Sequence, residues 1–364
     1  MIAPRFSVVI PTHDRRDAVM RLLRALRRQD PVPGGFEVVI VADGIGIGYL
    51  EPLVTARGFF GVVLRGWWES MFEESRRPGH RYVYSDLLSG HCSLERRAFE
   101  RLGGFDPTLR SHEDYELGYR ALAAGMNLRF LPDATAVHHE ASELRKTFRR
   151  KVDDGIADVS LLQRYPALGV SLPLARGRAP GLVGGVATHL AAISPRAGDG
   201  VAAGARWLLR AYERVGLRFR WRALLDDLLV YWYWRGILQA SGGMDELAAM
   251  LRKAPPPAEP DLELDLARGI ADAEHRLDEL RPRSVRFVYR EHPIGTVPER
   301  DGVERLRGIH LREMIVRHFA HEYLRAAARA RAIPHGLPAL PAEIMNASAT
   351  RPTSPPHARP RLVV

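Results

Sequence analysis

The chain has 364 residues, enough for about two or three domains with buried cores, and its 46% hydrophobic content excludes a largely disordered chain. The net charge of +10 comes mainly from arginine and favours acidic partners. The arginines are spread along the chain without a recognisable nucleic-acid-binding module, so no nucleic-acid role is expected.

The first predicted elements form a strand–helix–strand unit. Residues 6–11 and 36–42 are β-branched runs that predict buried parallel strands, and apolar residues recur at helical spacing from Val19 to Leu26. Such a unit predicts a right-handed crossover with ligands at the carboxyl ends of the strands. Residues 11–14 and Asp43 lie at those ends.

Residues 44–66 have a less regular pattern. The Gly-Ile-Gly-Ile-Gly of residues 44–48 superficially suggests a phosphate-binding loop. It lacks the spacing and the lysine of a P-loop, and it lacks the third glycine of a dinucleotide fingerprint. The remaining elements expected up to residue 145 are a helix over 67–75, a strand over 82–84, a helix over 94–102 closed by Gly103, a helix over 111–124, and strands over 128–131 and 134–138.

The C-terminal half is predicted to be mostly helical. Residues 146–254 form a helical region, with helices near 201–215 and 223–239. Residues 255–333 form a helix–hairpin–helix module that begins with a Pro-rich linker, followed by a helix over 262–280, a hairpin over 284–297 and a helix over 308–331. The tail, 334–364, is expected to be disordered because it is rich in Pro, Ala and Ser.

Cellular location is predicted from features that the sequence lacks. Cys92 is the only cysteine, so a disulfide framework and a cysteine-based zinc site are excluded, and a small buried side chain is expected there. No secretory leader is visible at residues 1–5, and no apolar run reaches the about 18–20 residues that span a bilayer. We expect a cytoplasmic protein and leave peripheral membrane contact open.

Two pairs of segments carry a family resemblance. The first pair is FSVVIPTHDR (residues 6–15) and FEVVIVADG (36–44), and the second is SGHCSLERRAFERLGGFDPTLRSHEDYELGYRALAAGM (89–126) and LRFLPDATAVHH (128–139). Together they resemble the nucleotide-sugar end and the acceptor end of an inverting family 2 glycosyltransferase. The resemblance implies an α/β fold in which residues 1–145 form an abbreviated, Rossmann-like GT-A domain, shortened near 44–66.

The resemblance also implies a nucleotide site. Pro11, Thr12, Asp14 and Asp43 correspond to the family's Pro-Thr turn and to the acidic residue after its second strand. The family often has Asn where Asp14 stands, and an Asp pair where Ala42 and Asp43 stand. Read without the resemblance, Pro11 and Thr12 end a strand and Asp43 makes an ordinary turn.

The most specific resemblance concerns Glu113 and Asp114, which follow Gly103–Asp106 at the family's spacing. It implies that Asp114 is the general base that deprotonates the acceptor hydroxyl, with Glu113 close to the acceptor. A local alternative is a capping box, in which Ser111 and Asp114 satisfy backbone N–H groups at a helix start. His91 stands where the family usually has an acceptor-site Asn.

A divalent Mg²⁺ or Mn²⁺ is the cofactor implied by the family, and His138 stands where the family often has a metal-ligating histidine, ahead of His139 as the candidate. Such an ion normally binds an Asp-x-Asp motif at a strand end. No Asp-x-Asp occurs between Asp43 and Ser89, where a sheet of this type normally has two further strand–helix units, on the order of 50 residues. The missing motif leaves catalytic competence open.

Two readings of the function therefore remain. The first is an enzyme that transfers a sugar, with inversion, from a nucleotide-sugar donor to a glycan, lipid or small-molecule acceptor. The second is a non-catalytic, glycosyltransferase-like binding or scaffold protein, peripheral at the membrane in one version. The aromatic run 231–234 fits a membrane anchor or a sugar-stacking surface, but helix-core packing is the preferred interpretation.

Overall fold

The computed structural model describes residues 7–8, 44–175, 181–253 and 259–330. The chain divides into two compact units. The first comprises Met1–Arg77, Tyr82–Pro256 and Arg300–Glu304, and the second comprises Pro78–Arg81, Pro257–Glu299 and Arg305–Val364. The first unit therefore holds both the predicted glycosyltransferase-like domain and the predicted helical region.

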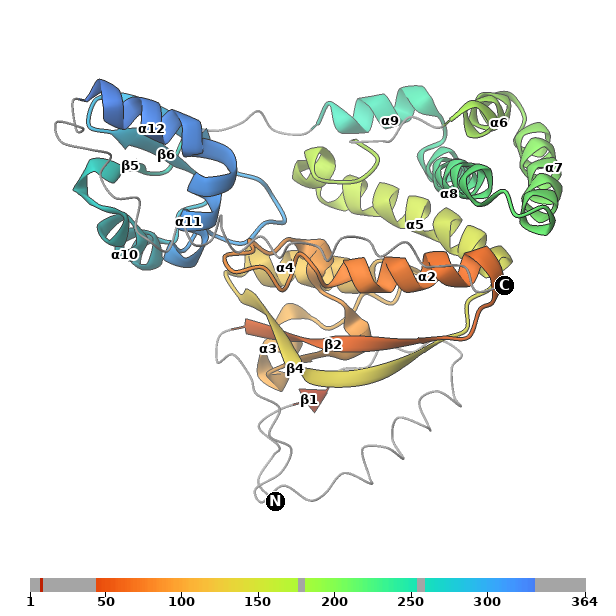
Figure 1. The fold of residues 1–364 in the computed structure, drawn as a ribbon, viewed down its shortest axis with the longest axis horizontal. Coiled ribbons are helices and arrows are strands. Elements are labelled where there is room, and N and C mark those ends of the chain that lie inside the picture. Colours follow the sequence, from red (N-terminus) through yellow and green to blue (C-terminus); the bar gives the residue numbers. More distant parts are fainter. Residues whose placement is uncertain (1–6, 9–43, 176–180, 254–258, 331–364) are drawn as a thin grey trace, which may run out of the picture. The chain divides into compact units, whose positions relative to one another are not determined.

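A mixed sheet organises the first unit (Figure 1). Its order is β1 (Ser7–Val8), β3 (Cys92–Leu94), β2 (Gly44–Val54) and β4 (Asn127–Glu140). β2 and β4 are parallel, whereas β3 is antiparallel to both β1 and β2. The expected α/β character is confirmed. The described part of the strand predicted over 6–11 was expected to be parallel but pairs antiparallel with β3, and a Rossmann-type arrangement stays a prediction because residues 9–43 lie outside the described residues.

β2 corrects the expectation of irregular structure after residue 44, because it is an 11-residue strand. Ile45 and Ile47 point into the core, and glycines alternate with them. A Cβ at Gly46 would stand 2.7 Å from Ser93 Oγ. The glycines thus mark the side of the strand where neighbouring side chains press against the backbone, which is a structural reason for the Gly-Ile alternation.

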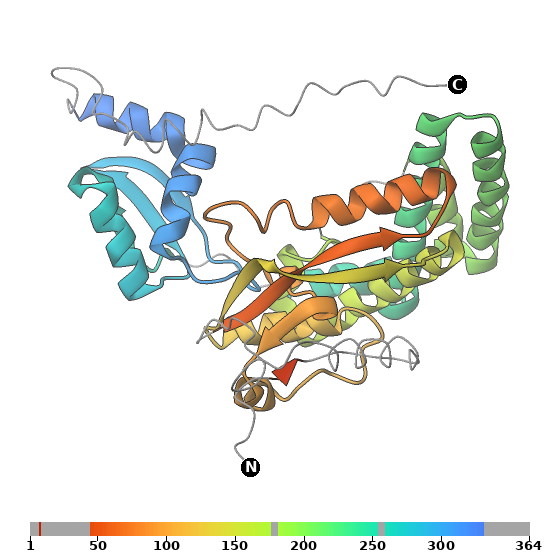
Figure 2. The same ribbon diagram turned by 60° about the horizontal axis from the view of Figure 1, so that its bottom comes forward.

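Three helices accompany this sheet: α2 (Gly58–Met71), α3 (Arg96–Leu102) and α4 (Glu113–Ala123). α2 lies along β2 (Figure 2) and begins earlier than the helix predicted over 67–75. Gly103 ends α3 with φ of 85°, as predicted. The strand predicted over 82–84 is wrong: Val83 forms an isolated bridge with Val303, and a 3₁₀ turn covers Tyr84–Asp86.

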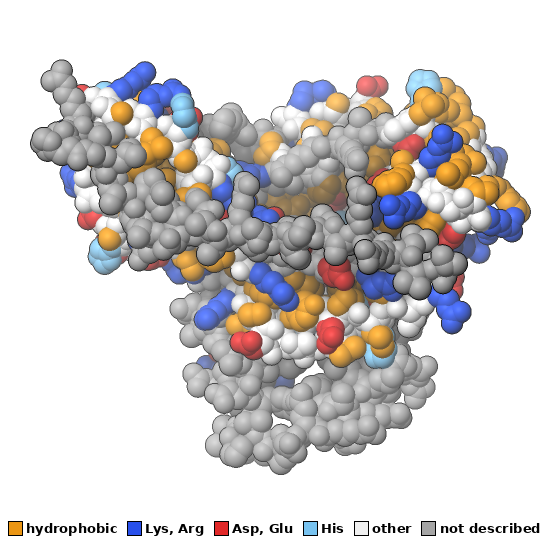
Figure 3. Space-filling view, in the orientation of Figure 1, with side chains coloured by type: hydrophobic (Ala, Val, Ile, Leu, Met, Phe, Trp, Pro, Cys, Tyr) orange, Lys and Arg blue, Asp and Glu red, His pale blue; other side chains and the backbone are white. Residues whose placement is uncertain are grey.

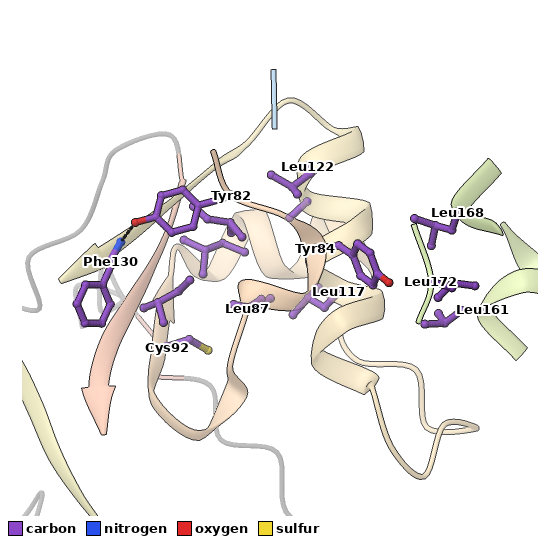
Figure 4. Packing of buried hydrophobic residues seen from close by; sticks show 14 of the residues in the cluster. Tyr82, Tyr84, Leu87, Cys92, Leu117, Leu122, Phe130, Leu161, Leu168 and Leu172 are labelled. Atoms are coloured by element: carbon purple, nitrogen blue, oxygen red, sulfur yellow. Dashed lines mark hydrogen bonds between the residues drawn. The ribbon is translucent and has the colours of Figure 1, made fainter. Parts of the chain in front are cut away.

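β4 is one strand where two were predicted. Its pairing with β2 shifts register after Leu131, so that Gly48 pairs with Leu131 and Tyr49 with Thr135. The residues between form a bulge that bends the strand without ending it. The hydrophobic core beside it includes Leu87, Leu117 and Phe130, and the backbone N–H of Phe130 donates to Tyr82 Oη at 2.8 Å (Figure 4).

The rest of the first unit is helical, as predicted for 146–254. It contains α5 (Leu144–Arg164), a 3₁₀ turn (Pro166–Val170), α6 (Leu182–Ile193), α7 (Pro195–Arg214), α8 (Arg218–Ser241) and α9 (Met244–Leu251). α8 packs along α5 and against α6 and α7. Tyr231 is fully buried in this cluster, while Tyr233 and Trp234 pack against the sheet's core. The aromatic run therefore packs in the cores, and the membrane-anchor reading of it is wrong.

The second unit has its own small sheet and core. Its elements are β5 (Glu263–Asp265), a 3₁₀ turn (Leu266–Arg268), α10 (Ile270–Leu280), β6 (Val285–Tyr289), β7 (His292–Val297), α11 (Gly308–Met314), a π turn (Ile315–Phe319) and α12 (Ala320–Arg329). The predicted hairpin is β6–β7. The helix predicted over 262–280 starts only at Ile270, because Leu264 pairs with Phe287 in the sheet and the Asp265 carboxylate accepts the N–H of Ala267.

Residues 254–258 of the predicted linker and the tail 334–364 lie outside the described residues. Among the residues that are described, none of the helices has the length and apolar character needed to span a membrane.

Candidate active site

The start of α4 meets a short 3₁₀ turn, Ser89–His91, and this junction holds the predicted base. Asp114 Oδ2 accepts hydrogen bonds from the backbone N–H and from Oγ of Ser89, each at 3.1 Å. Asp114 Oδ1 accepts the N–H of Tyr115 at 3.0 Å. The carboxylate is half-buried and held in one orientation, with remaining lone pairs on its oxygens.

The capping-box alternative is wrong. The residue that caps α4 is His112, with φ of 63°, and no side chain caps the helix. Ser111 Oγ instead donates to Asp154 Oδ1 of α5 at 2.7 Å. A left-handed backbone is uncommon for histidine, so contacts elsewhere must hold it. Asp114 therefore forms no reciprocal capping box with Ser111, although its Oδ1 accepts the first-turn N–H of Tyr115.

Glu113 lies beside Asp114 in the first turn of α4. Burial raises the pKa of the Glu113 carboxyl, and the negative charge of Asp114 raises it further. Two neighbouring carboxyls of which one binds its proton more tightly are a common arrangement in acid–base sites. Glu113 therefore holds its proton more tightly than an exposed glutamate does, beside the carboxylate of Asp114.

A buried network behind α4 holds His112. Its Nδ1 lies 2.9 Å from Asp158 Oδ1, and its Nε2 lies 3.5 Å from Asp154 Oδ1. Burial alone would lower the pKa of His112, but the hydrogen bond and charge of Asp158 and the charge of Asp154 raise it. Tyr233 of α8 also donates to Asp158. The imidazole ring stacks on Tyr115, with centroids 4.5 Å apart.

These network residues were not predicted from the sequence, although a signal existed. Asp154 and Asp158 are one helical turn apart on α5, among apolar residues at the same spacing such as Leu161. Carboxylates on the apolar face of a helix need partners, and they point to a buried polar network.

His91 lies near Asp114 through the same turn. Its Nε2 is 3.1 Å from the carbonyl oxygen of Ala134, and its ring covers Gly48, where a Cβ would stand 2.1 Å from the ring. Burial lowers the pKa of His91. The structure thus places His91 against β2 and β4, two residues from the Ser89 that holds Asp114. Its role in acceptor binding stays a prediction.

His138 lies elsewhere on β4, about 13 Å along the strand from Ala134 at the usual rise per residue. Its ring packs on Trp68, with centroids 4.5 Å apart, and its Nε2 is 3.8 Å from Glu140 Oε2. Glu140 also accepts from Trp68 Nε1 and from the N–H of Ser142. Burial would raise the pKa of Glu140, but the neighbouring His138 and the hydrogen bonds from Ser142 and Trp68 outweigh it and lower the pKa to about 2.

The described residues do not by themselves fit a divalent cation. No group of three His, Cys, Asp or Glu side chains lies together among them, and both oxygens of Glu140 beside His138 already accept hydrogen bonds. We assign no chemical step to a metal. Mg²⁺ or Mn²⁺ and His138 as its ligand stay predictions, and the predicted nucleotide residues Pro11, Thr12, Asp14 and Asp43 lie outside the described residues.

One named relative matches part of the chain. Over 80 residues, the chain is 35% identical to the "Pre-mycofactocin glycosyltransferase" of Mycobacterium tuberculosis, in strains CDC 1551 / Oshkosh and ATCC 25618 / H37Rv alike. The match spans 22% of this chain and only 17% of the relative's length. No family model and no solved structure matches the chain.

Proposed function

We propose that this chain is an inverting glycosyltransferase of the family 2, GT-A type, with Asp114 as its general base. The observation that carries the proposal is the anchored carboxylate of Asp114 at the start of α4, fixed by two donors of Ser89 beside a Glu113 whose pKa is raised. The similarity to a named glycosyltransferase supports sugar transfer in general. Inversion and the family assignment rest on the resemblance of the sequence motifs.

The proposed reaction is a single displacement. Asp114 accepts the proton of the acceptor hydroxyl while that oxygen forms a bond to the anomeric carbon of the sugar. The bond between the anomeric carbon and the diphosphate oxygen breaks, and the nucleoside diphosphate leaves with the bonding electron pair. Attack opposite to the leaving group inverts the anomeric configuration. Ser89 holds the base in place, which is a positioning role.

The substrates are proposed by class. The donor is a nucleotide sugar, bound through Pro11, Thr12, Asp14 and Asp43 by resemblance. The acceptor is a hydroxyl of a glycan, lipid or small molecule that approaches Asp114 near His91. The relative is named for the glycosylation of pre-mycofactocin, so pre-mycofactocin is the first acceptor to test.

Two measurements test the proposal. The first is calorimetric titration of the full chain with UDP, GDP and TDP, with and without Mn²⁺. The second is release of the nucleoside diphosphate from the matching sugar nucleotides, with and without acceptor alcohols. We expect one nucleotide to bind and Asp43→Ala to abolish that binding. Asp114→Asn should abolish the release of the nucleoside diphosphate and leave nucleotide binding unchanged.

The outcomes separate the two readings. Nucleotide binding without any sugar transfer, across the donor panel, would replace the enzyme with a non-catalytic nucleotide-binding protein. Absence of binding to all three nucleotides would overturn both the donor site and the reaction. The Asp114→Asn variant is isosteric, and its amide oxygen can still accept both hydrogen bonds of Ser89, whereas the hydrogen bond from the N–H of Tyr115 is lost. Circular dichroism and the unfolding midpoint of the variant check that the fold is kept.

A further inference from the structure

Exposed apolar side chains gather on one part of the helical region. Eight of the exposed large hydrophobic residues lie between positions 182 and 219: Leu182, Val186, Ile193, Trp207, Leu208, Val215, Leu217 and Phe219. Phe219 is 77% exposed and Trp207 70%. Singly exposed hydrophobic residues are normal, but so many within 38 consecutive positions, with two large aromatic rings among them, are not explained by the fold.

Two of these apolar residues, from different helices, line one pocket. Leu182 at the start of α6, Leu208 on α7 and Arg220 on α8 line the same cavity of about 490 Å³. Residues 213–220 run from the end of α7 to the first turn of α8, and all of them are exposed. We call the exposed side chains of Trp207–Arg220, together with Leu182, the α7–α8 tip. Figure 3 shows hydrophobic and basic side chains intermixed over this part of the molecule.

Arginines surround these apolar residues. Arg210, Arg214, Arg218 and Arg220 are exposed, and Arg210 and Arg218 lie over the rings of Trp207 and Phe219, at 5.0 and 4.7 Å from the ring centroids. On the helical wheel of α7, Trp207, Arg210 and Arg214 lie opposite the buried Ala202, Ala205 and Leu209. The outward face of α7 is thus both aromatic and cationic.

The carboxylates nearby do not neutralise this face. Asp199 accepts from Tyr231 Oη at 2.6 Å and pairs with Arg235, and Glu213 accepts the N–H of Phe59 at 3.1 Å. Asp226 is paired with Arg222. Within the part of the chain that the structure describes, no carboxylate forms an ion pair with Arg210, Arg214 or Arg218.

We propose that the α7–α8 tip docks the protein onto anionic lipid membranes. Aromatic and aliphatic side chains set among arginines match an interface where apolar groups enter the headgroup region and guanidinium groups meet lipid phosphates. The charge selects the occupant: a neutral protein groove or a second copy of this cationic surface would leave the arginines uncompensated. In this proposal the tip binds at the membrane surface and does not cross the bilayer.

The test is flotation of the full chain with two kinds of vesicle, one of phosphatidylcholine alone and one of phosphatidylcholine with phosphatidylglycerol. We expect flotation with the anionic vesicles only, and its loss at high salt, because the arginine contribution is screened. The Trp207→Glu/Phe219→Glu double variant is expected to reduce the partition coefficient about tenfold or more. Both residues are largely exposed, so the variant keeps the parent's circular dichroism and unfolding midpoint.

The matched control is Trp67→Glu, which adds a carboxylate in place of another half-exposed tryptophan of the same unit, on α2. It is expected to float like the parent. If the parent stays at the bottom with anionic vesicles, or if the double variant floats as well as the control, the proposal is wrong. If the double variant instead converts a dimer to a monomer in light scattering, with no vesicle binding by the parent, the tip is a self-association surface and the proposal also fails.

Discussion

α4 carries two acidic clusters, one at Asp114 and one at Glu116, and they differ in how their oxygens are used. Both residues lie in the first turn of the helix, two positions apart. Asp114 is half-buried and anchored by Ser89, with lone pairs to spare. Glu116 is only 2% exposed. Its oxygens accept Nε of Arg120 at 2.8 and 2.9 Å and Oη of Tyr165 at 2.7 Å. The carboxylate of Asp114 is oriented and has lone pairs left to accept a proton, whereas the oxygens of Glu116 are occupied by hydrogen bonds from Arg120 and Tyr165.

The second cluster explains residues that matched the family motif without having a chemical role. Arg120 bridges Glu116 to the carbonyls of Leu102 and Gly104, so it ties α4 to the turn that ends α3. A Cβ at Gly118 would lie 2.4 Å from the carbonyl oxygen of Tyr84. The same short segment thus carries a candidate base at Asp114 and, two residues on, the contacts that fix the helix bearing it.

The substitution Asp114→Asn tests most directly whether Asp114 has a catalytic role that Glu116 lacks. Removing a general base typically lowers the rate by about 10²–10⁴-fold. We expect that loss in nucleoside diphosphate release. The unfolding free energy should fall by only about 1 kcal/mol, because the amide oxygen can still accept from Ser89 and only the hydrogen bond from the N–H of Tyr115 is lost. Activity within a few-fold of the parent would show that Asp114 is not the base, and that its role is as structural as that of Glu116.

For Glu116→Gln, by contrast, we expect mainly a loss of stability. The amide would offer one acceptor oxygen to Arg120 and Tyr165 and would place N–H groups against the guanidinium. Breaking a buried pair on one side typically costs about 3–5 kcal/mol. Urea unfolding of the variant measures this cost. A midpoint equal to that of the parent would contradict the view that Glu116 holds the helix.

Gly118→Ala is expected to cost about 1–3 kcal/mol, because the added methyl group meets the backbone of Tyr84. Gly66→Ala on α2 is the matched control, since a Cβ there meets nothing within 4 Å. It should stabilise the protein by up to about 1 kcal/mol through helix propensity. Equal effects of the two substitutions on the urea midpoint would remove the case for tight packing at Gly118.

The α4 start was predictable from the sequence because its motif is long and contiguous. The Gly103 cap and the helix over 111–124 follow from local rules of periodicity and left-handed backbone, which neighbouring chain segments do not override. The helical character of 146–254 follows similarly from apolar spacing.

What could not be predicted depends on contacts distant in sequence. The strand β2 looked irregular because glycines usually weaken strands, but here Ser93 and His91 occupy the space beside Gly46 and Gly48. The sequence pattern predicts Ser111 as a helix cap, but its hydroxyl group donates a hydrogen bond to Asp154 of α5 instead. Local propensity carries no information about a partner 43 residues away.

The smallest expected change in stability comes from His112, which links α4 to α5. The groups that face its imidazole are Asp154 and Asp158 of α5 and Tyr115 and Asp114 of α4, and Tyr233 of α8 shares Asp158. Because the pKa of His112 is raised in the folded state, the stability it contributes is present below its unfolded pKa of about 6.5. That contribution is lost as the pH rises through the folded pKa.

His112→Asn isolates this contribution, since asparagine tolerates the left-handed backbone at position 112. We expect the parent's urea midpoint to fall relative to that of the variant as the pH rises above about 6.5, while other histidines affect both proteins equally. The difference curve between the two proteins is therefore the measurement. Parallel curves would mean that folding does not change the pKa of the imidazole. His112 would then hold the start of α4 by hydrogen bonds and, unlike Glu116 with Arg120, by no ion pair.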